Sequence, residues 1–212
     1  MYQVNPLGGD YVAPGSSAGL PTGANAANAS LNPLPGWPLD SLGACEANLG
    51  KVPPAGCSIV YHPFGIWFAN ATTLYVADEG STTLANPAPG GLEKWIYNAN
   101  LAKWELKYTI AASTIPGYSV NGVGNLFAVG LRNISGIIDD NGVVTIYAIT
   151  STGGQTLNDE GADPNQLVSI TDPVAATTLP AGESFSVVET ATYGNVLRGV
   201  AVLSPGSGAQ GH

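Results

Sequence analysis

The sequence has little charge, and most of the charge it has is acidic. Only 10% of its 212 residues are charged, with 6 Lys and Arg against 15 Asp and Glu. Amphipathic helices need a charged outer face, so this composition disfavours a helical fold. With so few basic residues, the chain cannot form a basic patch that would bind nucleic acid. An anionic membrane surface is an equally poor partner. The net charge of −9 suits calcium or a cationic partner, or simply a solvated acidic surface.

Long apolar runs are also missing. The chain contains no run of about 18 apolar residues, which is the length needed to span a bilayer. The N-terminal stretch MYQVNPLGGDYV lacks the basic start and apolar core of a signal peptide. We therefore expect either a mature chain or a piece of a longer protein.

Cysteine is scarce, with two residues that lie close in sequence. Cys45 and Cys57 flank a loop rich in Pro and Gly, where a disulfide would stabilise the fold by about 3 kcal/mol through loop-closure entropy. Two free thiols are the alternative. A metal site is less favoured, because His62 is the only further ligand nearby and about four are usual. A disulfide predicts an oxidising compartment, and therefore a secreted or periplasmic protein.

Glycine and proline are plentiful, at 28 and 16 residues, and they divide the chain. Residues 1–60 predict a loop-rich N-terminal segment, and 206–212 a flexible tail. Between them, over 61–205, short β-rich runs alternate with turn clusters, as in antiparallel sheets. The expected strands are 64–70, 72–80, 91–100, 102–110, 130–139, 143–151, 165–172 and 184–193. NAN and DNG predict hairpin turns, and the uniformly apolar FGIWFA and LYVA predict inner strands, while LEKWIY and KWELKY predict half-exposed outer ones.

The strand pattern then repeats. FGIWFA, GLRNIS and VLRGVA align at Ile66, Arg132 and Arg198, an even step of 66 residues, so that 194–204 would open a third unit. Four strands per unit are typical of β-propeller blades, with longer loops than usual. A β-sandwich of about eight short strands is the alternative. Two units do not close a ring, so the chain is a fragment, folds its first 60 residues into another blade, or completes the ring with a second copy.

Several of these segments resemble a known family. PFGIWFANATTLYVADEG, GGLEKWIYN, GLRNISGIIDDNGVVTIYAITS, GADPNQLVSITD and VLRGVAV are similar to the C-terminal half of secreted bacterial β-propeller proteins. The resemblance covers about residues 55–205 and implies a half-length member of that family. It extends distantly to lactonase-type propellers, which bind a divalent ion, usually calcium, in the central channel. No residue-by-residue match to that metal site is present.

In a β-propeller, the loops between the second and third strands of each blade lie on the same face as the starts of the first strands. This face surrounds one end of the central channel, called the mouth below. This arrangement predicts a site where acids and arginines converge. The calcium candidates are Asp78, Glu79, Asp159, Glu160, Asp163 and Asn165, because calcium prefers about six to eight oxygen ligands. The ligand-binding candidates are Arg132, Arg198, Asn133 and His62. For the acids the alternative role is turn capping, and for the arginines it is a structural ion pair with an acid of the neighbouring blade.

Known catalytic motifs are missing: there is no GxSxG, HExxH or phosphate-binding glycine loop. We therefore expect a secreted module that binds a small molecule or a protein on its acidic loop face. A calcium-dependent, lactonase-like hydrolase is the first alternative. A self-assembling propeller fragment, possible because open blade edges can pair between copies, is the second.

Overall fold

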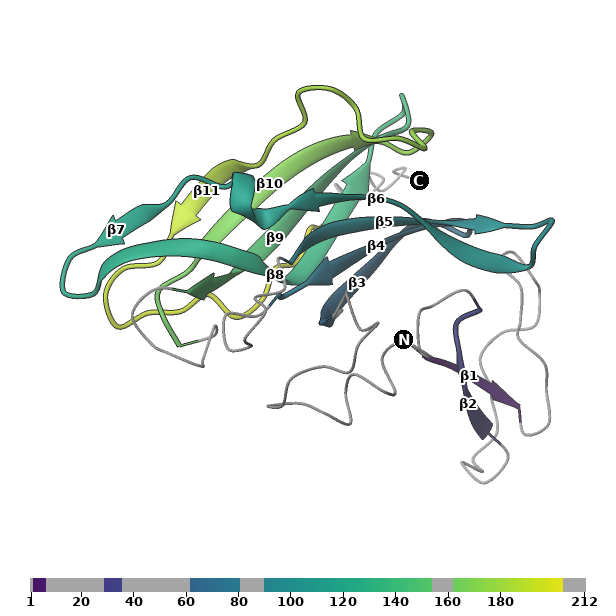
Figure 1. Cartoon of the computed structure of the whole chain (residues 1–212), viewed down its shortest axis with the longest axis horizontal. Coiled ribbons are helices and arrows are strands. Elements are labelled where there is room, and N and C mark those ends of the chain that lie inside the picture. The colour runs from purple at the N-terminus through teal and green to yellow at the C-terminus, as the bar shows by residue number, and fades with distance from the viewer. Residues whose placement is uncertain (1, 7–28, 36–61, 81–89, 154–161, 204–212) are drawn as a thin grey trace, which may run out of the picture.

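A computed structural model describes residues 2–6, 29–35, 62–80, 90–153 and 162–203, and these ranges form an all-β structure. Figure 1 shows three antiparallel sheets. The smallest pairs β1 (Tyr2–Pro6) with β2 (Ala29–Pro33). The first sheet has the order β3 (Pro63–Asn70), β4 (Thr73–Asp78), β5 (Gly91–Asn98) and β6 (Lys103–Ala111).

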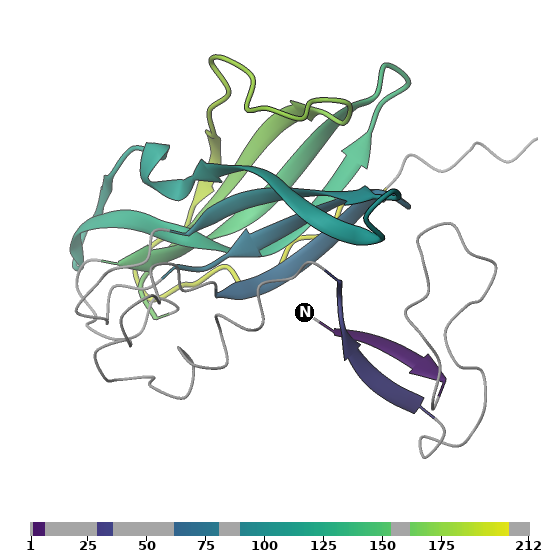
Figure 2. The ribbon, with the colours of Figure 1, turned by 45° about the vertical axis from the view of Figure 1, so that its right-hand side comes forward.

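After a 3₁₀ turn at Ala112–Thr114, the chain forms the second sheet. Its strands are β7 (Tyr118–Val120), β8 (Gly124–Ile138), β9 (Val143–Gly153), β10 (Gln166–Pro173) and β11 (Ser186–Thr190). They lie side by side in sequence order, and Figure 2 shows the sheet curling into a half-barrel. Register shifts at Ala128/Gly130 and Leu131/Ile134 mark bulges in β8, which bend a strand and increase its twist.

Both predicted hairpin turns are confirmed. The Asn98 side chain accepts a hydrogen bond from the backbone N–H of Asn100, 3.1 Å away. At the DNG turn, Asp139 accepts the N–H groups of Asn141 and Val143 at 2.9 and 2.8 Å. Gly142 adopts a φ of +76°, which a side chain would disfavour. Short-range turn chemistry therefore fixes both connections.

Three strand expectations were wrong. Residues 194–203 form no strand, although they were expected to open a third unit, because no second strand follows in the described chain to pair with them. The hairpin of β7 and the first half of β8 was not expected, although its Asn121–Gly122 turn has a positive φ of +86° at the glycine. The strands β1 and β2 lie in the segment read as loop.

The expected division into inner and outer strands is confirmed for β4, whose residues are all buried, and for the half-exposed edge strand β6, but it was wrong for β3 and β5. β3 is an edge strand whose Phe64, Ile66 and Phe68 are about half exposed, at 50%, 48% and 48%. β5 is buried instead, with Glu93 at 3% and Lys94 at 1% exposure. The reason is that both faces of the middle of the first sheet are covered, whereas one face of β3 has no cover among the described residues.

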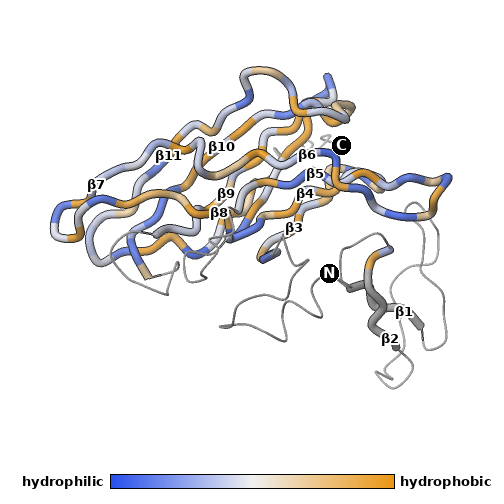
Figure 3. Tube along the Cα trace, in the orientation of Figure 1, coloured by the Kyte–Doolittle hydropathy of each residue, from blue (hydrophilic) through white to orange (hydrophobic). Residues whose placement is uncertain are grey.

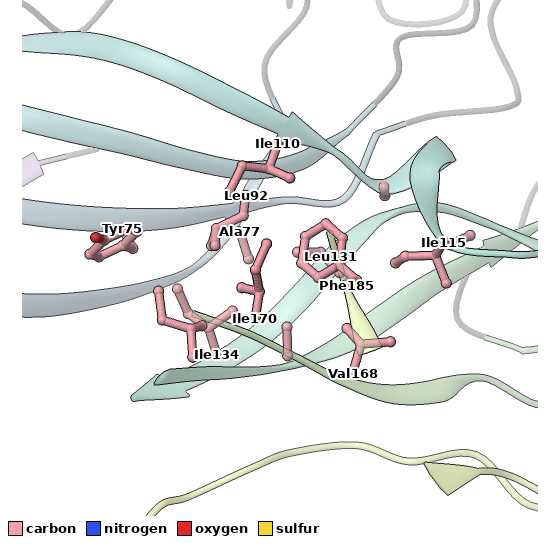
Figure 4. Close-up of a cluster of buried hydrophobic side chains, with 14 of the residues drawn as sticks. Tyr75, Ala77, Leu92, Ile110, Ile115, Leu131, Ile134, Val168, Ile170 and Phe185 are labelled. Carbon is pink, nitrogen blue, oxygen red and sulfur yellow. The ribbon is translucent and has the colours of Figure 1, made fainter. Parts of the chain in front are cut away.

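One hydrophobic core joins the two large sheets (Figure 4). Tyr75, Ala77, Leu92 and Ile110 point from the first sheet toward side chains of β8, β9 and β10. The residues on the second sheet include Leu131, Ile134, Val144, Ile146, Val168 and Ile170. Figure 3 shows hydrophobic stretches along these strands and polar residues at the hairpin turns. The sheets therefore pack face to face.

A second, smaller cluster covers the opposite face of the first sheet. Leu74, Val76, Trp95 and Trp104 pack there with Leu34 from the N-terminal region. The Trp104 backbone N–H donates to the Pro35 carbonyl at 2.8 Å, which fixes this segment against β6. Cys45, Cys57 and the tail 206–212 lie outside the described residues, so the predicted disulfide and the tail stay predictions.

Candidate functional site

Glycines allow the two large sheets to cross closely at one place. A Cβ atom at Gly65 would lie 2.3 Å from the Arg132 carbonyl oxygen, and one at Gly130 would lie 2.2 Å from the Glu79 carbonyl. No side chain fits at such distances, so the crossing depends on glycine. It brings the start of β3, the end of β4 and the middle of β8 together, which is where the sequence predicted a mouth.

Asp78 is buried at this crossing and caps a turn. Its Oδ1 accepts the Gly80 N–H at 2.8 Å, and its Oδ2 accepts the His62 N–H at 3.1 Å. Burial raises the pKa of Asp78, and the two N–H groups oppose that shift. Both carboxylate oxygens thus already have backbone partners, which is the capping role that the sequence analysis kept as the alternative to calcium binding.

Glu79 and Arg132 form an ion pair between the sheets. Arg132 Nε lies 2.9 Å from Glu79 Oε2, and its guanidinium carbon lies 5.1 Å from the centre of the Phe64 ring. Both charged side chains are partly exposed. The expected arginine–acid pair across neighbouring units is therefore present, with a cation–π contact beside it.

The remaining ligand-binding candidates do not join this pair. His62 lies beside it, with its Nδ1 atom buried and without a hydrogen-bond partner among the described residues. Asn133 is half-buried on β8. Arg198 is exposed and forms no ion pair within the described ranges.

The predicted calcium loop is seen only in part. Asp159 and Glu160 lie outside the described residues, and Asp163 is buried. Asn165 has a structural role: its Nδ2 donates to the Leu197 carbonyl at 3.0 Å, and its Oδ1 accepts the Leu197 N–H at 2.8 Å. Across the described ranges, no three His, Cys, Asp or Glu side chains lie close enough to hold a metal ion.

Comparisons with known proteins add no family assignment. No protein-family model matches this chain, and no curated protein or solved structure matches it either. Within the described residues, no helix has the length and apolarity needed to cross a membrane. The resemblance to secreted propellers therefore stays an expectation from the sequence.

A second polar cluster lies deeper, between the two sheets, and sequence reasoning missed it. Lys94 Nζ lies 2.7 Å from Asp172 Oδ2 and 2.6 Å from the Pro173 carbonyl oxygen. The hydroxyl groups of Tyr75 and Tyr108 both donate to the Asp172 carboxylate. Lys94 and Asp172 are 1% and 0% exposed, so this is a charge pair removed from water.

One signal in the sequence could have located Lys94. Side chains two apart on a strand share a face, so Lys94 shares its face with Leu92. Leu92 belongs to the core between the sheets, and a lysine on the same face must find a buried partner. No local pattern identifies Asp172 as that partner, because the two residues are 78 positions apart.

Glu93 occupies the opposite face of β5. Its Oε2 accepts the indole N–H of Trp95 at 2.8 Å. Burial raises the pKa of Glu93 to about 7, the charge of Asp78 adds to the rise, and the Trp95 hydrogen bond opposes it. The first sheet thus carries a buried acid on one face and a buried base on the other.

Proposed function

We propose that the chain is a module of β-propeller type, exported to an oxidising compartment, that binds a protein partner on the open side of its first sheet. The partner is a second copy of the same chain. The observation that carries this proposal is the exposed apolar row of Phe64, Ile66 and Phe68 on β3.

The strand order supports propeller-type units. Strands β3 to β6 form one four-stranded meander. Strands β8 to β11 follow the same order, but β7 extends their sheet to five strands, against the expected four. Face-to-face packing alone is common to sandwiches and to neighbouring blades, but immunoglobulin-type sandwiches use Greek-key connections in place of two successive meanders.

The first strands also pack at a constant separation in sequence. Gly65 of β3 lies against Arg132 of β8, and Ser135 of β8 accepts the Val202 N–H through its Oγ at 3.0 Å. Both pairs are 67 residues apart in the sequence. The contact of Val202 with β8 therefore has the same separation in sequence as the contact of β8 with β3, as expected if this segment took the place of a third first strand.

This spacing supports a second copy as the partner of the apolar row on β3. β8 contacts β3 through Arg132 and Gly136 and contacts Val202 through Ser135, whereas among the described residues β3 has such a neighbour only on the side of Gly65 and Trp67. Ile66 and Phe68 alternate with those residues and so face the other way, whereas Phe64, at a register shift, contacts the Arg132 side chain. Exposed aromatic and aliphatic side chains in a row, with Arg132 stacked on Phe64, have the composition of a protein interface.

A second copy offers a matching surface. Its segment 194–203 ends in Leu203, which is 89% exposed, and has no sheet of its own. Contact between the β3 row of one copy and this segment of the next is head-to-tail, and such contacts generate rings when the rotation closes. This arrangement supplies the blades that a single chain lacks.

Sedimentation velocity over a range of concentrations tests the proposal. We expect the wild-type chain to form oligomers and the Ile66→Lys variant to sediment as a monomer, because a lysine would have to lose its water of hydration at the contact. Leu179→Lys is the matched control, since Leu179 is equally exposed, at 46%, but lies outside β3. A wild-type chain that stays monomeric at every concentration would contradict the proposal.

A further inference from the structure

A lysine and two carboxyl groups meet in the interface between the two sheets. Lys94 of β5 contacts Asp172 of β10 at 2.7 Å, and both are fully buried. Glu183, from the connection between β10 and β11, completes the group. Both of its carboxyl oxygens are buried without a hydrogen-bond partner among the described residues. An unsatisfied buried carboxyl group next to a buried ion pair needs an explanation.

We propose that Lys94 and Asp172 are joined by an amide bond that forms autocatalytically after folding, with Glu183 transferring the proton. The bond links Lys94 Nζ to Asp172 Cγ and releases one water molecule. It would tie the first sheet to the second covalently across the core. No oxidant, cofactor or second substrate is required.

The reaction starts from the observed ion pair. Lys94 Nζ and Asp172 Oδ2 are in direct contact, so transfer of one proton from the ammonium to the carboxylate gives a neutral amine beside a neutral acid. The amine nitrogen then attacks Cγ. Glu183 accepts a proton from this nitrogen and returns one to the departing hydroxyl group, which leaves as water, so that Glu183 is regenerated and one hydrogen stays on the amide nitrogen.

Glu183 has the properties of a proton carrier. Burial, followed by the negative charge of Asp172, raises the pKa of Glu183 to about 7. A carboxyl group with a pKa near neutrality can both accept and donate a proton at physiological pH. The charge of Lys94 also acts on Glu183, which places the three groups in one electrostatic cluster.

The two tyrosines stabilise the charge that develops during the attack. Tyr75 and Tyr108 both donate hydrogen bonds to the Asp172 carboxyl oxygens. Burial, and then the hydrogen bond to Asp172, raise the pKa of both hydroxyl groups, so both keep the proton that they donate. Fixed donors aimed at a developing oxyanion, in a site closed to water, lower the barrier of acyl transfer.

Burial also favours the product. Holding two charges in a dry interface costs solvation free energy, and amide formation removes both charges. The product remains compatible with its surroundings, because the amide oxygen can accept the tyrosine hydrogen bonds and the amide N–H can donate to the Pro173 carbonyl, which already lies 2.6 Å from Nζ.

The mass of the purified full-length chain tests the proposal. Under reducing and denaturing conditions we expect a mass lower than that of the sequence by one water molecule. Trypsin should no longer cleave after Lys94, so peptide 52–103 should remain joined to peptide 133–198, which contains Asp172. A folded chain of full sequence mass that trypsin cleaves after Lys94 would overturn the proposal.

Two variants separate the bond from other losses of water. Lys94→Arg keeps the positive charge but is a poor nucleophile, and Glu183→Gln keeps the shape but cannot carry the proton. We expect both variants to have the full sequence mass and the β-type circular dichroism of the wild type. A loss of water that persists in Lys94→Arg would refute the bond, and a bond that forms normally in Glu183→Gln would refute the role of Glu183.

Discussion

The buried carboxyl group of Glu93 gives the sharpest prediction on stability. In the folded chain the pKa of Glu93 is raised from 4.5 to about 7, and each unit of such a shift corresponds to about 1.4 kcal/mol. The folded state therefore holds its proton more tightly than the unfolded state does. The free energy of unfolding should fall by up to ~3 kcal/mol as the pH rises from about 4.5 to about 7, and no further above that.

The variant Glu93→Gln isolates this contribution. Glutamine is neutral at every pH and its side-chain oxygen can still accept the Trp95 N–H. We expect the variant and the wild type to be similarly stable near pH 4.5, and the variant to be more stable by up to ~3 kcal/mol at pH 8. Urea unfolding at a series of pH values measures the difference. Glu183, whose pKa is also raised, contributes equally to both proteins and cancels, whereas the charge of Asp78 acts on Glu93 and is part of the measured difference.

Glu105 provides the matched control. It lies on the neighbouring strand β6, and a hydrogen bond from Lys107 lowers its pKa. Glu105→Gln should therefore gain no advantage between pH 4.5 and 8. An advantage of Glu93→Gln that does not depend on pH, or a loss of stability at pH 8, would refute the reasoning.

Three further predictions follow from the crossing of the sheets and from the acidic loop. Gly130→Ala should lower the free energy of unfolding in urea by ~3 kcal/mol or more, because its Cβ would overlap backbone atoms. Gly199→Ala is the control: Gly199 has open space around it, so this variant should change stability by less than about 0.5 kcal/mol. A double-mutant cycle with Arg132→Ala and Glu79→Ala should give a coupling of ~1 kcal/mol that salt weakens, since the pair is partly exposed; no coupling would show that the contact is not maintained in solution. If the acidic loop binds calcium, as one alternative from the sequence expects, calcium should raise the melting temperature and Asp159→Ala should abolish the rise; an unchanged melting temperature would exclude a calcium site in this loop.

Most strands of the two large sheets could be predicted from sequence because their signals are local. Turn residues such as Asn98 and Asp139 bond to the backbone within four positions, and apolar runs between such turns gave strands in the correct order. The 66-residue step also placed Arg132 near an acid of the neighbouring unit. Asn121–Gly122 carried the same kind of local signal and was overlooked.

Burial of particular strands could not be predicted in this way. Alternation in LEKWIY indicates two faces, but it does not show that both are covered, here by the second sheet and by Leu34. The apolar residues of β3 likewise did not show that it is an edge strand. A strand is at an edge when no other strand pairs with it on one side, and its own residues do not encode that. The pairing of Lys94 with Asp172 depends on how two sheets dock, and that information is distributed over the whole core.

The central claim is that stacked units of this chain are completed by another copy through the open side of β3. A structure of the assembled particle by electron cryo-microscopy tests it most directly. The account predicts a closed ring in which Phe64, Ile66 and Phe68 of each copy are buried against residues 194–203 of the next. Particles of a single chain with this row in solvent, or an assembly that leaves it exposed, would contradict the account.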